Sequence, residues 1–169
     1  MRLGFAHFLD KNVQLVYGHG APDVELEANF MVAHCLGLWG NLNCIWQSGS
    51  SDGVSNLTAF DMKTISMGAK LIFCSRWPSV QAYIGIGVLG TYLCVEDRIP
   101  PATSQTYRFG GGLLGKSGFH FRFEKNLFLD PFFDYYYQPV SVDDKALITS
   151  GDTINMGGFR VGLGLGIDF

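Results

Sequence analysis

Two glycine-rich strings in this sequence have the spacing of phosphate-binding sites. Residues 110–117, Gly-Gly-Gly-Leu-Leu-Gly-Lys-Ser, match the pattern GxxxxGK[ST], and Asp130 ends a short apolar run that could serve as a magnesium-binding strand. Residues 85–90 match the dinucleotide pattern GxGxxG. Both kinds of site require a helix after the glycines, because the helix N-terminus holds the phosphates. Both strings instead continue with alternating polar and apolar residues, which predicts strands and no nucleotide cofactor.

Nine charged or titratable side chains form a second candidate site, because alternation places them on the polar faces of predicted strands. They could be an active site or a path for protons or ions. The simpler interpretation is a network of ion pairs in the lumen of a barrel, since an isolated buried charge is costly. The set is Lys70, Arg108, Lys116, His120, Arg122, Asp130, Asp134, Arg160 and Asp168.

The histidines and cysteines show no spacing typical of a metal site, so we expect neither a metal nor a cofactor. His34, on an apolar face, is the only stray catalytic candidate, and no serine or acid lies at a useful spacing from it. We expect the cysteines to be free thiols. They are Cys35, Cys44, Cys74 and Cys94.

The stretch 155–169 shows most clearly which kind of secondary-structure element positions the nine charged or titratable residues. One face carries Phe159, Val161, Leu163, Leu165, Ile167 and Phe169, and the other carries glycines with Arg160 and Asp168. Strict alternation over this length predicts a strand whose two faces meet different media. A continuous apolar face opposite a face of glycine and charge is typical of a transmembrane barrel, with lipid outside and a cramped polar lumen.

The bulk composition agrees with a β-rich protein. Of the 169 residues, 16% are charged, against about 25% in a typical soluble domain, while 14% are aromatic and 22 residues are glycine. No apolar run reaches the roughly 18 residues of a spanning helix. The formal net charge of −3 gives no basic surface for nucleic acid.

The alternation predicts eight strands, near residues 13–18, 24–38, 42–47, 57–73, 81–92, 107–123, 127–138 and 155–169. Short turns at 39–41, 75–79 and 124–126 alternate with loops at 48–56, 95–104 and 141–152, as in an up-and-down membrane barrel. We therefore predict an all-β protein, a single eight-stranded antiparallel up-and-down transmembrane β-barrel domain over residues 1–169, with 1–11 as lead-in and 12–169 as barrel.

With the strands and turns assigned in this way, the aromatic residues form two belts, as expected at the two membrane interfaces. The belt beside the long loops comprises Tyr17, Tyr92, Tyr107, Tyr135 and Tyr137. The belt beside the short turns comprises Trp39, Phe73, Trp77, Phe121, Phe123 and Phe169.

Residues 68–73, 83–87, 126–130 and 134–137, together with the terminal Phe169, resemble the small eight-stranded outer-membrane barrel superfamily, which includes the OmpA transmembrane domain, OmpX, OmpW and the opacity proteins. The resemblance covers residues 13–169. It implies a mature protein of a Gram-negative-type outer membrane, whose signal peptide is not present in this chain, and a role for Phe169 as the assembly signal. The implied partners are outer-membrane lipids and lipopolysaccharide, the barrel-assembly machinery, and an extracellular ligand bound through the loops, but no nucleic acid.

We expect a structural or surface-interaction role with a polar, plugged lumen and no catalysis. The alternative is binding or passage of small hydrophobic molecules, as the resemblance to OmpW suggests, with Leu89, Leu114, Phe132 and Tyr136 in the lumen. A third hypothesis, an enzyme that modifies lipid A or lipopolysaccharide, is weakened because residues 134–138 lack the His-x-Ser pair of resembling deacylases. A soluble lipocalin-like barrel would expose a ring of phenylalanines to water.

Overall fold

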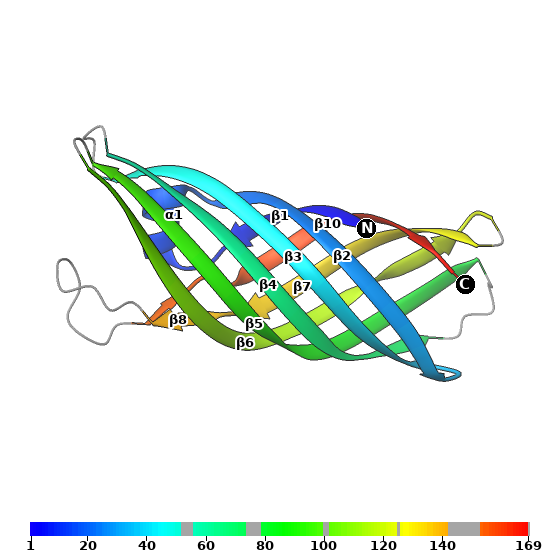
Figure 1. Ribbon diagram of the computed structural model, residues 1–169. Helices are drawn as coiled ribbons and strands as arrows, with labels where there is room; N and C mark the ends of the chain where they lie inside the picture. Colours follow the sequence, from blue (N-terminus) through cyan, green and yellow to red (C-terminus); the bar gives the residue numbers. More distant parts are fainter. Residues whose placement is uncertain (52–55, 74–78, 100–101, 125, 142–152, 169) are drawn as a thin grey trace.

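The computed structural model of the protein describes residues 1–51, 56–73, 79–99, 102–124, 126–141 and 153–168 (Figure 1). Ten strands and one short helix account for most of them. In chain order they are β1 (Arg2–Phe8), α1 (Lys11–Tyr17), β2 (Gly20–Ala33), β3 (Leu36–Ser51), β4 (Asn56–Phe73), β5 (Val80–Ile99), β6 (Ala102–Arg122), β7 (Leu127–Tyr137), β8 (Pro139–Ser141), β9 (Thr153–Asn155) and β10 (Gly158–Ile167).

Eight of these strands close into an antiparallel barrel. The order around the ring is β5, β4, β3, β2, β1, β10, β7 and β6, and β6 pairs again with β5. The small strands β8 and β9 pair with each other, and β8 pairs with β6 through Val140 opposite Gly110. The predicted all-β fold, an eight-stranded antiparallel barrel, is confirmed.

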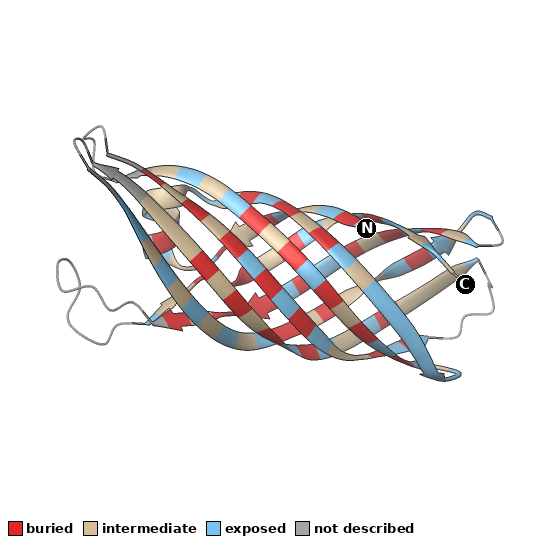
Figure 2. Ribbon diagram, viewed as in Figure 1, coloured by how far each residue is buried: buried red, intermediate tan, exposed pale blue. Residues whose placement is uncertain are grey.

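The alternation of faces is also confirmed on the long strands (Figure 2). On β10, Val161, Leu163, Leu165 and Ile167 are exposed, whereas Arg160, just before them, and Gly164, between them, are buried. On β7, Leu129, Phe133, Tyr135 and Tyr137 are exposed, and Asp130 and Asp134 are buried. An exterior of large apolar side chains around an interior of charge is the reverse of a soluble barrel.

The two glycine-rich strings lie inside strands. Residues 110–117 belong to β6 and residues 85–90 to β5, each paired over its whole length with a neighbouring strand. Neither string has the helix that would hold a phosphate. Among the described residues, no helix is long and apolar enough to cross a membrane.

The first thirty residues differ from the prediction. The first strand, β1, lies inside the expected lead-in 1–11, and the strand expected at 13–18 is the helix α1. The Asp10 carboxylate accepts a hydrogen bond from the Asn12 amide (2.9 Å), and Gly18, at φ 78°, ends the helix. An Asp before the first turn and a Gly after the last are helix signals, and they prevail over the short alternation between them.

The turn between β2 and β3 also differs from the prediction. The chain turns at residues 34–35, and the turn expected at 39–41 lies inside β3. Trp39 therefore faces the lumen, where it is 3% exposed, and does not join the belt beside the short turns. Space for it comes from the facing glycine of β5, since a Cβ atom on Gly87 would lie 2.5 Å from the Trp39 ring.

At the end of the barrel where α1 lies, several strands extend further than predicted. β3 continues to Ser51 and β5 to Ile99, so much of the expected loops at 48–56 and 95–104 is strand. β8 and β9 flank the expected loop at 141–152, of which residues 142–152 lie outside the described residues. The belt residues Trp77 and Phe169 also lie outside them. The other belt residues beside the short turns, Phe73, Phe121 and Phe123, are exposed.

Candidate functional site

A buried cluster of charges occupies the middle of the barrel. We call it the lumen charge network, and its members come from six strands: Arg2, Asp23, Glu25, Glu27, Lys70, Lys116, His120, Asp130, Asp134 and Arg160. Period-2 alternation places each of these side chains inward. None of them has a side chain more than 9% exposed.

Arg2, on β1, joins strands on opposite sides of the network. Its Nη1 atom lies 2.9 Å from both Glu25 Oε1 and Glu27 Oε2, and its Nη2 atom lies 2.6 Å from Asp130 Oδ2. Arg2 Nη2 also donates to the Tyr83 hydroxyl (2.6 Å), which in turn donates to Asp130 Oδ1 (2.9 Å). The planar guanidinium thus binds three carboxylates and a phenol together, which a lysine could not do.

Lys116 and Arg160 form the second half of the network. Lys116 Nζ lies 2.8 Å from Glu25 Oε1, contacts Glu27, and lies 3.8 Å from Asp134 Oδ2. Arg160 Nη2 lies 3.1 Å from both Glu25 Oε2 and Asp134 Oδ2. Glu25, Glu27 and Asp134 are therefore each shared between cations, and β2, β6, β7 and β10 are held to one another through the lumen.

Aromatic rings pack against the cations of the network. Lys116 Nζ lies 4.6 Å from the centre of a Trp39 ring, and Lys70 Nζ lies 4.9 Å from the Tyr83 ring. The Arg2 guanidinium lies 4.9 Å from the Phe132 ring and that of Arg160 lies 5.4 Å from Tyr136. Rings at these distances attract a cation and also fill the lumen beside it.

The charges of the network nearly balance. Five carboxylates face the four cationic side chains of Arg2, Lys70, Lys116 and Arg160, and His120 Nε2 lies 4.0 Å from Asp130 Oδ1. Because the groups are out of water, each depends on its partners for compensation. In the part of the chain that the structure describes, no group of histidine, cysteine and acidic side chains could hold a metal ion.

The structure brings together six of the nine predicted site residues: Lys70, Lys116, His120, Asp130, Asp134 and Arg160. Arg122 and Asp168 form a separate, partly exposed pair (2.9 Å). Arg108 is half-buried and lies nearer the start of β6 than Lys116 and His120. It donates to the Tyr107 carbonyl at 3.5 Å and is not among the residues that define the network. The proposed assembly signal, Phe169, lies outside the described residues.

Sequence reasoning missed Arg2, Asp23, Glu25 and Glu27. Arg2 lay in the supposed lead-in, and the three acids lie at the start of the strand whose boundaries were wrong. A usable signal was present, because Asp23, Glu25 and Glu27 alternate with Val24 and Leu26 in the printed sequence. Three acids on one inward face of a strand would have predicted partners for the lysines and arginines that face the lumen from the other strands.

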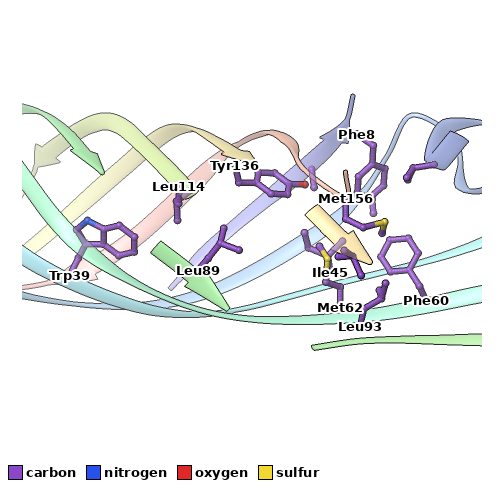
Figure 3. Close-up of a cluster of buried hydrophobic side chains, with 14 residues drawn as sticks. Phe8, Trp39, Ile45, Phe60, Met62, Leu89, Leu93, Leu114, Tyr136 and Met156 are labelled. Carbon is purple, nitrogen blue, oxygen red and sulfur yellow. The ribbon is translucent and has the colours of Figure 1, made fainter. Parts of the chain in front are cut away.

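An apolar layer fills the lumen between the network and α1 (Figure 3). Its labelled side chains form a row from Trp39 through Leu114 and Leu89 to Phe8 and Phe60. Val13 of α1 belongs to the same cluster and is 4% exposed. A cavity of about 10 Å³ lies within this row, bordered by Ile45, Leu89 and Arg160 among others. That volume is room for about one water molecule.

The comparisons with known proteins bear on the fold. No family model matches the sequence, and no curated protein is significantly similar to it. Among solved structures, Neisserial surface protein A matches with a TM-score of 0.62 at 16% identity, over 99% of this chain and 94% of that one. The outer membrane protein OprG from Pseudomonas aeruginosa matches with a TM-score of 0.68 at 14% identity, over 99% and 93%.

Ail, the attachment invasion locus protein of Yersinia pestis, solved in complex with the heparin analogue sucrose octasulfate, matches with a TM-score of 0.59 at 14% identity, over 99% of this chain and 95% of that one. These structural neighbours are small outer-membrane barrel proteins of the kind that the sequence resembles. At identities this low, the likeness establishes the fold of the chain.

Proposed function

Because the chain has the fold of the small eight-stranded outer-membrane barrels, we propose that it is an integral protein of a bacterial outer membrane with a structural or surface-interaction role, a plugged lumen and no catalysis. The observation that carries this proposal is the lumen charge network. Its ion pairs connect β1, β2, β4, β6, β7 and β10 across the interior. A lumen crossed by buried, mutually compensated charges supports a rigid scaffold better than an open channel.

The apolar row and α1, which lie on one side of the lumen charge network along the barrel, support the same role. The cavity within the apolar row has a volume of about 10 Å³, which is too small for a hydrated solute. Any solute passing through would have to displace both the ion pairs and the apolar layer. The proposed absence of catalysis fits the network too, since its charges are engaged with one another and with aromatic rings.

The long strands at the α1 end of the barrel support a surface role. A tilted strand crosses a bilayer with about 9–11 residues, whereas β6 has 21 and β5 has 20. These strands therefore project beyond the bilayer. The proposed partners are outer-membrane lipids and lipopolysaccharide around the barrel, the assembly machinery, and an extracellular ligand at the projecting end. The complex of Ail with a heparin analogue is a precedent for a ligand on a barrel of this fold.

The test is reconstitution of the refolded protein in planar bilayers and in vesicles containing lipopolysaccharide. We expect no conductance steps above the lipid baseline, and no change in the mass of any vesicle lipid after prolonged incubation. Regular conductance steps would contradict the plugged lumen, and a deacylated or acylated lipid product would contradict the non-catalytic role.

One observation favours a second candidate, the binding of small hydrophobic molecules. Leu89 and Leu114, expected to line an apolar upper lumen, are buried there at 7% and 2% exposure. A ligand could replace part of this layer if α1 moved aside. Binding of the fluorescent probe N-phenyl-1-naphthylamine by the protein in detergent, lost in Leu114→Gln and kept in Leu15→Gln on the exposed side of α1, would support this candidate. Equal binding by both variants would exclude it.

A further inference from the structure

The small cavity in the lumen lies where the apolar row meets the lumen charge network. Arg160 of the network borders it, and so do Leu89 and Leu114 of the row. Six of its ten lining side chains are polar, which distinguishes it from a simple packing defect in an apolar core. These six are Asn43, Thr64, Ser66, Tyr136, Gln138 and Arg160.

Two of the polar side chains carry a buried atom without a protein partner. Within the described parts of the chain, neither Arg160 Nε nor the Tyr136 hydroxyl has a hydrogen-bonding partner. Arg160 is 4% exposed and Tyr136 is 3% exposed, and the Arg160 guanidinium lies 5.4 Å from the centre of the Tyr136 ring. Figure 3 shows the Tyr136 side chain among those of the apolar row. Native proteins rarely bury polar atoms without a partner, because the lost hydration is not replaced.

A complementary acceptor is available on β4. Ser66 Oγ donates its own hydrogen to Asn41 Oδ1, so that its lone pairs can accept a further hydrogen bond. Arg160 Nε can only donate, whereas the Tyr136 hydroxyl can donate or accept. A water molecule matches this set, since it can accept from Arg160, donate to Ser66 and bond to Tyr136 in either direction. Three hydrogen bonds are typical of a buried water.

We propose that this cavity is a binding site for one internal water molecule, which joins Arg160 of β10, Tyr136 of β7 and Ser66 of β4 through hydrogen bonds. The cavity volume of about 10 Å³ corresponds to a single water-sized sphere. The site lies inside the barrel wall, and the water therefore connects three strands that are not neighbours at this point of the lumen.

The charges around the cavity favour a neutral occupant. The Arg160 guanidinium, on its border, repels a cation. The network that Arg160 belongs to has five carboxylates against four cationic side chains, which disfavours an anion. An apolar occupant would leave Arg160 Nε and the Tyr136 hydroxyl without partners. Water is the small neutral molecule that satisfies both.

The bound water also connects two hydrogen-bonded groups that meet at the cavity. One is the lumen charge network. The other consists of Thr64, Thr91 and Gln138: Thr64 Oγ1 lies 3.1 Å from Thr91 Oγ1, and Gln138 Nε2 donates to Thr91 Oγ1 at 2.6 Å. Thr64 and Gln138 themselves border the cavity. The inference goes beyond the proposed function, because the site is internal and does not depend on what the barrel binds outside.

The direct test is a crystal structure of the refolded protein at a resolution that shows ordered water, with a second crystal held under xenon pressure. We expect a density peak within hydrogen-bonding distance of Arg160 Nε and the Tyr136 hydroxyl, and no xenon in the cavity. Dry apolar cavities bind xenon, whereas a polar cavity that holds water does not. A xenon peak in the cavity, or no density beside the two atoms, would overturn the proposal.

The sign of a single substitution gives a second test in solution. Tyr136→Phe removes the hydroxyl and keeps the ring. If the hydroxyl binds the proposed water, its loss is expected to lower the unfolding midpoint in detergent by about 2–4 °C. If the hydroxyl has no partner, its removal relieves a desolvation cost and raises the midpoint. A raised or unchanged midpoint would therefore contradict the proposal. Tyr135→Phe, on the exposed face of the same strand, is the matched control and is expected to leave the midpoint unchanged.

Discussion

At the scale of single residues, the interior of this barrel is held by charges that compensate one another. Lys116 is the clearest case, because its ammonium contacts Glu25, Glu27 and Asp134 and is 1% exposed. A buried pair adds little relative to an apolar replacement of the whole pair, but removing one partner leaves the others uncompensated. The network therefore makes a strong prediction about single substitutions.

Lys116→Ala is expected to lower the free energy of unfolding by about 3–5 kcal/mol, because three carboxylates lose a shared cation. The measurement is urea unfolding of the protein in detergent micelles, followed by tryptophan fluorescence. Lys63→Ala is the matched control, since that lysine pairs with Asp61 on the outer surface and both are well exposed. Equal effects of the two substitutions would show that the lumen network does not stabilise the barrel.

Gly166 tests the packing of the narrow lumen. A Cβ atom at this position would lie 2.1 Å from the Phe128 ring, and the three atoms nearest to it all belong to that ring. Gly166→Ala is expected to cost about 1–3 kcal/mol of unfolding free energy, the usual cost of overpacking, and the second change Phe128→Leu is expected to recover most of it. Additive losses in this double-mutant cycle would contradict the contact.

At the scale of elements, α1 closes the end of the apolar layer and depends on its caps. The Asp10 carboxylate accepts hydrogen bonds from the Asn12 amide (2.9 Å) and from the Asn155 amide of β9 (3.1 Å). The helix packs through Val13, and Tyr17 contacts Phe60 edge to face at 4.8 Å. With seven residues, the helix owes its stability to these contacts.

Asp10→Ala is therefore expected to make the opening of α1 easier by about 1 kcal/mol, and so to speed hydrogen exchange of its amides several-fold. Lys11→Ala, at an exposed neighbouring position, leaves both hydrogen bonds of Asp10 in place and serves as control. Unchanged exchange in Asp10→Ala would show that the cap does not hold the helix. Exchange elsewhere in the barrel is expected to stay constant.

The strands that the sequence predicted well are those whose two faces meet lipid and a packed lumen along their whole length. The residues of β10 and β7 alternate without interruption, and their faces follow from the side chains alone. α1 was not predicted because a segment of seven residues fits both the period of a strand and that of a helix. The residues that distinguish the two are the caps at its ends, Asp10 and Gly18. The turn at 34–35 was missed because it contains neither glycine nor proline, whereas Gly40 and Asn41 imitate a turn inside β3.

The candidate site was predicted in part for the same reason. Lys116, Asp134 and Arg160 lie on regular strands, so alternation alone placed them in the lumen. The partners Arg2 and Glu25 lie on strands whose bounds were wrong. Which cation meets which carboxylate follows from the registers between strands and from the closure of the ring, and neither can be deduced from one strand's pattern.

At the scale of the whole molecule, the apolar exterior and the charged interior require a membrane. Leu163, in the middle of β10, is 56% exposed. Leu163→Arg is expected to cost about 2–4 kcal/mol of folding free energy in lipid vesicles, because the charge would lie within the bilayer. Leu15→Arg, on the exposed side of α1, is the matched control and is expected to fold normally. Normal folding of both variants in lipid would contradict the assigned exterior.

The most direct test of a closed membrane barrel is the mobility of the refolded protein in a detergent gel, with and without boiling. A closed ring of paired strands resists detergent, so we expect the unboiled protein to run as a compact species and the boiled protein to shift to the position of its full length. Identical mobility of the two samples, together with full solubility in buffer without detergent, would mean that the exposed apolar face is covered by protein, and would contradict the account.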